Sequence, residues 1–158
     1  MMYKKKIYDI KTAIEKLKNY CALQEKCKWD VKQKMKEWRL RNKVQDYIIE
    51  ELINENYIDE ERYSRSFCRG KFKIKKWGKM KIINELKKKY ISEIFINKGL
   101  EEISDAEYLK ELYMQYQKKK DSIKEKSYIL RKRKITTYLI NKGYESNLVW
   151  NQLKELKE

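Results

Sequence analysis

The amino-acid sequence predicts an all-α protein, built as an elongated, curved array of three tandem three-helix repeats with the last one incomplete. Three observations lead to this fold class: apolar positions recur three times, helix-capping signals recur at matching places, and the composition favours helices. The 158 residues include no proline and only four glycines. No long segment alternates with period two as a half-buried strand would. Repeats of this size bury their faces by stacking on their neighbours.

The apolar repeat aligns residues 38–52, 86–100 and 139–153 without a gap, with periods of 48 and then 53 residues. We expect Trp38, Leu86 and Leu139 to occupy equivalent core positions in successive units. A competing interpretation is that any two amphipathic helix pairs align, but one register held across two helices and their loop favours the repeat. The remaining columns are Met35/Ile83/Thr136, Tyr47/Phe95/Leu148, Ile48/Ile96/Val149 and Leu52/Leu100/Leu153.

Helix-capping signals recur in step with this repeat. Asp59 and Ser104 are favourable N-cap residues, and each is preceded by isoleucine and followed four residues later by tyrosine, which is the pattern of a hydrophobic staple. At the ends of helices, a left-handed residue is expected in the column Asn42/Tyr90/Gly143, where tyrosine fits poorly. We expect one continuous array with an N-terminal helix in residues 1–29 and repeats over 30–76, 77–120 and 121–158.

The chain is strongly basic, with 40 Lys and Arg against 24 Asp and Glu and a net charge of +16. Such a balance favours a polyanionic partner, although a generally lysine-rich proteome would also raise the charge. The clustering of the basic residues favours a binding role. We expect two basic clusters at junctions between repeats, and we expect Trp77 to be an exposed anchor beside the first. The candidate partner- and nucleic-acid-binding residues are Lys71, Lys73, Lys75, Lys76, Trp77, Lys79, Arg131, Lys132, Arg133 and Lys134.

Residues suited to catalysis or metal binding are scarce. The sequence has no histidine, and its three cysteines form no C-x-x-C pair, so we expect no catalytic residue, metal site or cofactor. Gly78-Lys79 lacks the other residues of a phosphate-binding loop, since Lys73 and Met80 stand where glycine and Ser or Thr are needed. Residues 1–12 lack the apolar core of a signal peptide, and no stretch is apolar enough to span a membrane. We therefore expect a cytoplasmic, non-enzymatic monomer.

Three segments resemble a known family in their order and spacing. These are YCALQEKC at 20–27 followed by Asp30-Val31-x-x-Lys34-Met35, IDEERYS at 58–64, and Gly78-x-x-x-Ile82-x-x-Glu85-Leu86. They are similar to the opening of the RecX regulatory proteins, to the I-D-D-x-R-F-A signature of that family and to its G-x-x-x-I-x-x-E-L segment. The second segment departs from the signature at Glu60, Tyr63 and Ser64. The resemblance covers residues 13–153.

The resemblance to RecX implies a protein that binds in the groove of the RecA filament on DNA and inhibits recombinase, ATPase and coprotease activity without catalysing a reaction. DNA contact would be electrostatic, with single- or double-stranded DNA. Two other interpretations fit the residues: a sequence-independent nucleic-acid-binding helical module without RecA specificity, and an interaction scaffold whose charge reflects its proteome.

Overall fold

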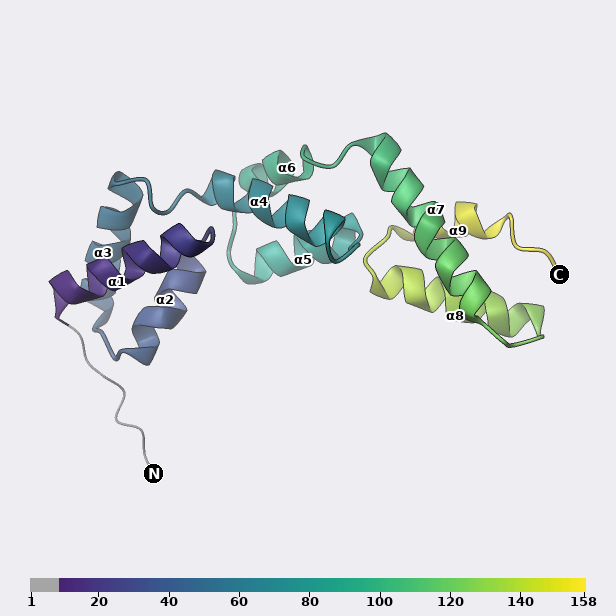
Figure 1. Ribbon diagram of the computed structural model, residues 1–158, viewed down its shortest axis with the longest axis horizontal. Coiled ribbons are helices and arrows are strands. Elements are labelled where there is room, and N and C mark those ends of the chain that lie inside the picture. Colours follow the sequence, from purple (N-terminus) through teal and green to yellow (C-terminus); the bar gives the residue numbers. More distant parts are fainter. Residues whose placement is uncertain (1–8) are drawn as a thin grey trace, which may run out of the picture.

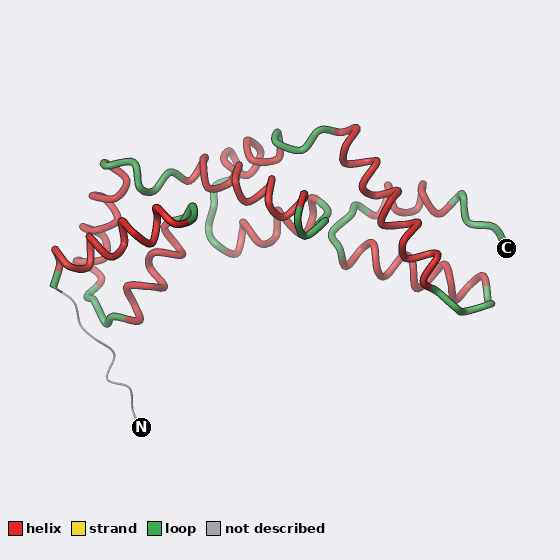
Figure 2. The backbone as a smooth tube through the Cα atoms, in the orientation of Figure 1, coloured by secondary structure: helices red, strands yellow, loops and turns green. Residues whose placement is uncertain are grey.

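The computed structural model describes residues 9–158, and these residues form nine α-helices and no strand (Figures 1 and 2). The helices follow one another in a long, curved row, with α1 and α9 at opposite ends of it (Figure 1). The all-helical fold class is confirmed, while part of the expectation for residues 1–12 lies outside the described residues. The helix bounds are α1 Ile10–Leu23, α2 Lys28–Glu37, α3 Asn42–Asn54, α4 Glu60–Lys73, α5 Lys79–Lys88, α6 Glu93–Leu100, α7 Asp105–Ser122, α8 Tyr128–Asn141 and α9 Ser146–Leu153.

The helices associate in three consecutive groups of three. Both α1 and α2 pack against α3, α4 packs against α5 and α6, and α7, α8 and α9 contact one another. The units are therefore α1–α3, α4–α6 and α7–α9, which we call units 1, 2 and 3, and the tandem three-helix repeat is confirmed. The boundaries expected after residues 29, 76 and 120 fall one helix too late, because periodicity alone does not identify the helix that opens a unit. The third unit therefore contains three helices, like the other two.

The opening helices of units 2 and 3 begin where the capping signals place them. The Asp59 carboxylate accepts the backbone N–H of Arg62 at 3.0 Å, and the Ser104 hydroxyl accepts that of Glu107 at 3.2 Å. Both caps satisfy N–H groups that have no partner within the helix. The flanking apolar residues of each predicted staple are buried: Ile58 with Tyr63, and Ile103 with Tyr108.

Equivalent positions of the units are fixed by the turn between the second and third helix. In each unit, the carbonyl oxygen of one residue accepts a hydrogen bond from the N–H of the residue five positions later. The accepting residues are Met35, Leu86 and Leu139. These residues are 51 and 53 positions apart, so the register predicted for the last two copies holds and the first copy is shifted by three residues. Trp38, which was expected to match Leu86, is the half-buried C-cap of α2, and Met35 takes the core position instead.

The same turn contains a left-handed residue in every unit. Arg39 and Tyr90 have φ angles of 59°, and Gly143 has a φ of 101°. The prediction was right for Tyr90 and Gly143 and wrong for Asn42, because the first turn ends one helical turn earlier than expected. Side chains with a Cβ pay a steric penalty in this conformation, so Arg39 and Tyr90 are locally strained.

The buried residues form two apolar clusters instead of three. Unit 1 has its own core, which includes Leu17, Val31 and Ile48. Units 2 and 3 share a single continuous core, which runs from Tyr63 of α4 to Leu156 beyond α9. The three cysteines, Cys21, Cys27 and Cys68, are free and buried, as packing residues should be. Units 2 and 3 therefore form one packed body.

The junction between units 2 and 3 is closed by direct backbone contact. The N–H groups of Gly78 and Met80, at the start of α5, donate to the carbonyl oxygens of Lys142 and Gly143 at 2.7 and 2.9 Å. A Cβ atom on Gly78 would overlap the backbone of Gly143 and Tyr144, so glycine is required for this approach. The positive N-terminal end of α5 thus meets the negative C-terminal end of α8, a favourable arrangement of helix dipoles.

The junction between units 1 and 2 depends instead on side-chain ion pairs around a small apolar contact that includes Cys27. Arg62 of α4 binds Glu25 at 2.7 Å, Lys89 binds Asp30 at 2.9 Å, and Lys28 lies 3.6 Å from Glu60. No backbone hydrogen bond within the described residues joins these two units. These ion pairs are only partly exposed, but they replace neither a shared apolar core nor backbone hydrogen bonds, and salt weakens them, so this junction is the weaker of the two.

Candidate nucleic-acid interface

The first predicted cluster of basic residues lies at the junction of units 2 and 3. Lys71 and Lys73 are in the last turn of α4, Lys75 and Lys76 are in the loop that follows it, and Lys79 begins α5. Two of these ammonium groups have a carboxylate neighbour, since Lys76 lies 3.7 Å from Glu111 and Lys79 lies 3.6 Å from Asp105. Lys73 and Lys75 are exposed.

Trp77 is half-buried, in contrast to the exposed anchor that we expected from its position between helices. Its ring meets Phe67 edge-on, with centroids 6.5 Å apart. The Nζ atoms of Lys71 and Lys81 lie 4.9 and 4.5 Å from the centroid of the Trp77 ring. Cation–π contacts of this kind hold the ammonium groups in place while leaving them able to bind an anion.

The second predicted cluster lies away from the junctions. Residues 131–134 occupy the N-terminal half of α8, whereas the opposite end of α8 contacts α5. Lys132, Arg133 and Lys134 are exposed, but Arg131 is half-buried and donates a 2.9 Å hydrogen bond to the carbonyl oxygen of Lys157. The expectation that both clusters lie at repeat junctions is therefore wrong for the second, and Arg131 holds the end of the chain.

The fold brings other lysines next to the first cluster. Lys142, beyond the C-terminus of α8, donates from its Nζ to the carbonyl oxygen of Lys75 at 3.2 Å. Partial burial, followed by the positive charges of Lys118 and Lys81, lowers the pKa of Lys142 from its ordinary value. Lys142 and Lys119 also lie 5.9 and 5.2 Å from the centroid of the Tyr138 ring.

Similar contacts continue toward unit 1. Lys89 lies 5.5 Å from the Trp29 ring and 5.9 Å from the Phe67 ring, and Lys26 lies 4.5 Å from the Tyr20 ring. Lys26, Lys71 and Lys89 line one cavity between unit 1 and α4. We call this series of lysines beside aromatic rings the lysine–aromatic band; its members, from unit 1 to unit 3, are Lys26, Lys89, Lys71, Lys81, Lys142 and Lys119.

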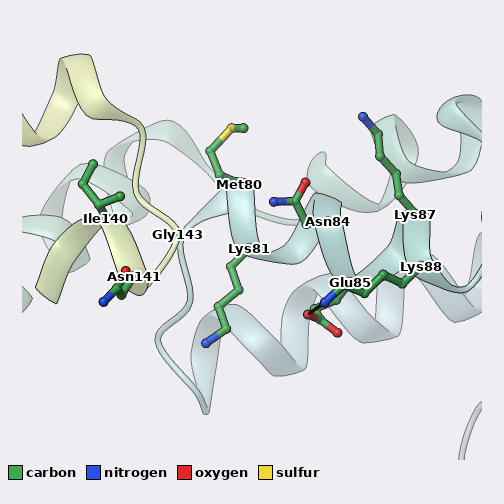
Figure 3. Close-up of a pocket in the computed structure, with 9 residues that line it drawn as sticks. All are labelled: Met80, Lys81, Asn84, Glu85, Lys87, Lys88, Ile140, Asn141 and Gly143. Carbon is green, nitrogen blue, oxygen red and sulfur yellow. Dashed lines mark hydrogen bonds and ion pairs between the residues drawn. The ribbon is translucent and has the colours of Figure 1, made fainter. Parts of the chain in front are cut away.

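An open cleft borders the band where α5 meets the end of α8 (Figure 3). Lys81 and Lys87 extend from opposite sides of α5, while Ile140 and Asn141 come from α8 (Figure 3). Glu85 is paired with Lys88 at 3.0 Å, so it neutralises only one of the lysines that line the cleft. This local excess of positive charge suits a phosphate backbone, which carries closely spaced negative charges.

Sequence reasoning missed Lys142, Lys26 and the grouping of the band. Lys81 and Lys89 belong to the lysine-rich run that follows α4, and Lys119 lies in a second basic run, so charge density alone was a signal for them. Lys142 stands apart from both runs in the sequence and joins the band only through the docking of α8 on α5.

The described residues include no cluster of three or more potential metal ligands. Among the helices of residues 9–158, none is both long and apolar enough to cross a membrane. The fold and the band define a class: a basic, tandem three-helix-repeat protein whose chemistry suits binding to a polyanion.

Comparison with known proteins finds similarity to the RecX regulatory proteins. Residues 59–100 match the family described as RecX, second three-helix domain, and these residues coincide with unit 2. The chain is 26% identical over 140 residues to the regulatory protein RecX of Bacillus cytotoxicus and 22% identical to that of Bacillus thuringiensis. The matched region covers 89% of this chain and 52% of each relative, so the chain spans about half the length of these relatives.

Solved structures agree on the fold. The crystal structure of RecX from Lactobacillus salivarius matches with a TM-score of 0.79 and 22% identity over 93% of this chain and 96% of that one. A second crystal structure, of a regulatory protein RecX, matches with a TM-score of 0.83 and 20% identity over 92% of this chain and 73% of that one. The chain therefore has the fold of these RecX structures, and its residues 59–100 match the second three-helix domain of RecX.

Proposed function

We propose that this protein binds the RecA–DNA filament in its groove and inhibits the recombinase, ATPase and coprotease activities of RecA. The observation that carries the proposal is the combination of a RecX fold with the lysine–aromatic band across all three units. An elongated array can contact several filament protomers at once, and linked weak contacts strengthen one another through effective concentration. The cytoplasm, where RecA filaments form, is the corresponding location.

DNA contributes to this binding through charge. If the band neutralises about five or six phosphates, the logarithm of the DNA affinity should fall against the logarithm of salt concentration with a slope of about −4 to −5. Fluorescence anisotropy with a labelled oligonucleotide at several salt concentrations measures this slope. A flat dependence would show that the band does not contact phosphates.

Inhibition of RecA ATP hydrolysis on single-stranded DNA tests the proposal. We expect inhibition at protein concentrations well below DNA saturation, and we expect it to persist when excess DNA is added. The alternative function, a nucleic-acid-binding module without RecA specificity, competes for free DNA, so its effect requires saturating protein and disappears with excess DNA. That result would contradict the proposal.

Charge-reversal variants identify the surface. The triple variant K71E/K81E/K142E changes the band, while K36E/K43E/K124E carries the same change in net charge on exposed residues outside it. We expect the first variant to lose inhibition and the second to keep it, with circular dichroism and thermal melting confirming that both are folded. If the first variant misfolds, the milder K71Q/K81Q/K142Q replaces it. Equal inhibition by both folded variants would exclude the band.

The two clusters predicted from the sequence can be reversed separately. Changing residues 71, 73, 75 and 76 to glutamate alters the junction between units 2 and 3, and changing residues 131–134 alters the far end of α8. Because only the first cluster adjoins the band, we expect it to have the larger effect on filament binding.

A further inference from the structure

A second surface, separate from the lysine–aromatic band, lies between α8 and α9. The two helices pack together in unit 3 (Figure 1). Each contributes side chains at helical spacing to one groove, lined by Tyr128, Lys132 and Thr136 of α8 and by Trp150, Leu153 and Lys154 at the end of α9. We propose that this groove binds an acidic segment of a partner protein that carries an apolar anchor side chain.

The apolar part of the groove suits an inserted side chain. Leu153 is 3% exposed and belongs to the core, Tyr128 packs against that core, and Trp150 is 65% exposed. A large aromatic side chain left in solvent beside a concave surface is typical of the anchor positions at protein interfaces. Ile129, in the first turn of α8, is also 68% exposed.

The charges of the groove determine the kind of partner. Lys132 and Lys154 are both exposed, and within residues 9–158 neither ammonium group makes an ion pair or hydrogen bond. None of the residues that line the groove is acidic. Carboxylates on both sides of an apolar anchor would therefore complement the groove. The net charge of +16 disfavours a second copy of this chain as the occupant.

The other two units show that this combination is particular to unit 3. In the register set by Met35, Leu86 and Leu139, the position of Trp150 holds Asp46 in unit 1 and Asn97 in unit 2. The position of Lys154 holds glutamate in both units, Glu50 and Glu101. Unit 3 thus replaces an acidic or polar surface with an aromatic and basic one on the same scaffold.

The column of Lys132 supports the preference for a carboxylate. Its equivalents are Lys28 and Lys79, and each lies 3.6 Å from an acidic side chain at the start of the following unit, Glu60 and Asp105 respectively. Lys132 has the same place in unit 3, and no carboxylate among residues 9–158 forms an ion pair with it. In units 1 and 2, the lysine at this position therefore forms an ion pair with an acidic residue at the start of a helix.

Fluorescence anisotropy with a labelled synthetic peptide tests the proposal in the absence of RecA and DNA. The peptide consists of glutamates with leucines at positions i, i+3 and i+4, which form one apolar stripe with carboxylates on both sides. The test variant W150N/K154E introduces the residues of unit 2, a substitution that the same scaffold already accommodates. The matched control Y113N/K134E likewise changes an aromatic residue to asparagine and a lysine to glutamate, at exposed positions of unit 3 outside the groove.

We expect the wild-type chain and the control to bind the peptide alike, and W150N/K154E to bind it at least about tenfold more weakly. Absence of wild-type binding, or equal weakening in both variants, would overturn the proposal. Equal binding of a lysine-for-glutamate version of the peptide would remove the charge preference and overturn it as well. If W150N/K154E loses binding to an oligothymidine strand but keeps the peptide, the groove is a nucleic-acid site. Because RecA is absent from the assay, none of these outcomes depends on the proposed function.

Discussion

Replacing Gly78 by alanine should open the junction between units 2 and 3. Gly78 has a φ of −75°, which alanine adopts without strain, so the effect of the added methyl group is steric. That methyl group would overlap the backbone of Gly143 and Tyr144, and backbone cannot move aside as a flexible side chain does. The junction must separate to accommodate it.

The magnitude follows from the contacts that separation breaks. Two backbone hydrogen bonds, from Gly78 to Lys142 and from Met80 to Gly143, contribute about 0.5–1.5 kcal/mol each. The ring contact of Phe72 in unit 2 with Tyr108 in unit 3, with centroids 5.9 Å apart, contributes about 0.5–1.5 kcal/mol more. We therefore expect the free energy of unfolding to fall by about 2–4 kcal/mol.

Urea unfolding followed by circular dichroism measures this loss, and Gly70→Ala provides the matched control. Gly70 lies within α4, and a Cβ there has no atom within 4 Å. Alanine at an open helical position should raise stability by about 0.5–1 kcal/mol. Hydrogen exchange of the Gly78 and Met80 amides should accelerate only in G78A. A G78A protein as stable as the wild type, with unchanged exchange at those amides, would refute the close-approach reasoning.

Three further predictions concern stability and reactivity. Leu86→Ala should reduce the free energy of unfolding by about 2–5 kcal/mol in urea titrations, since Leu86 is 0% exposed; a smaller loss would mean that the cavity collapses. Tyr90→Gly should raise the melting temperature, with a gain of about 0.5–1 kcal/mol, because Tyr90 is left-handed and 83% exposed; a lower melting temperature would contradict this. Burial raises the pKa of the Cys21 and Cys68 thiols to about 11 and that of Cys27 to about 12, so the thiolate forms only above these values. A thiol reagent at pH 8 should therefore label the protein only after urea unfolds it, and rapid labelling of the folded chain would be inconsistent with these pKa values.

Much of the fold could be predicted because its signals are local. The caps at Asp59 and Ser104 and the staples around them depend on residues within one helical turn, and all are present. The register of unit 1 could not be read from apolar spacing, since Trp38 matches the apolar pattern but caps α2. Gln45, a polar residue, is buried in the column of Ile96 and Val149, and its side-chain amide donates to the carbonyl oxygen of Leu40 at 2.8 Å. A pattern of apolar residues omits such a position.

For the candidate site, the sequence predicts only which segments are rich in basic residues. Lys71 and Lys75 stand in a conspicuous basic run, but the burial of Trp77 and the arrival of Lys142 depend on how units 2 and 3 dock. Arg131 belongs to an equally basic run and yet holds the end of the chain, through its bond to Lys157. Sequence alone does not separate a basic side chain with a structural partner from one available to a ligand.

The unequal junctions give the molecule unequal stiffness along its length. Units 2 and 3 share one core and backbone hydrogen bonds, so they resist bending as a single rod. Unit 1 is joined by the ion pairs of Arg62 with Glu25 and of Lys89 with Asp30, whose strength decreases as salt screens them. Bending is therefore concentrated at one joint, and Lys89 belongs both to that joint and to the lysine–aromatic band. An anion that drew Lys89 away from Asp30 would loosen this joint, so we expect the curvature of the molecule to change if it binds a polyanion there.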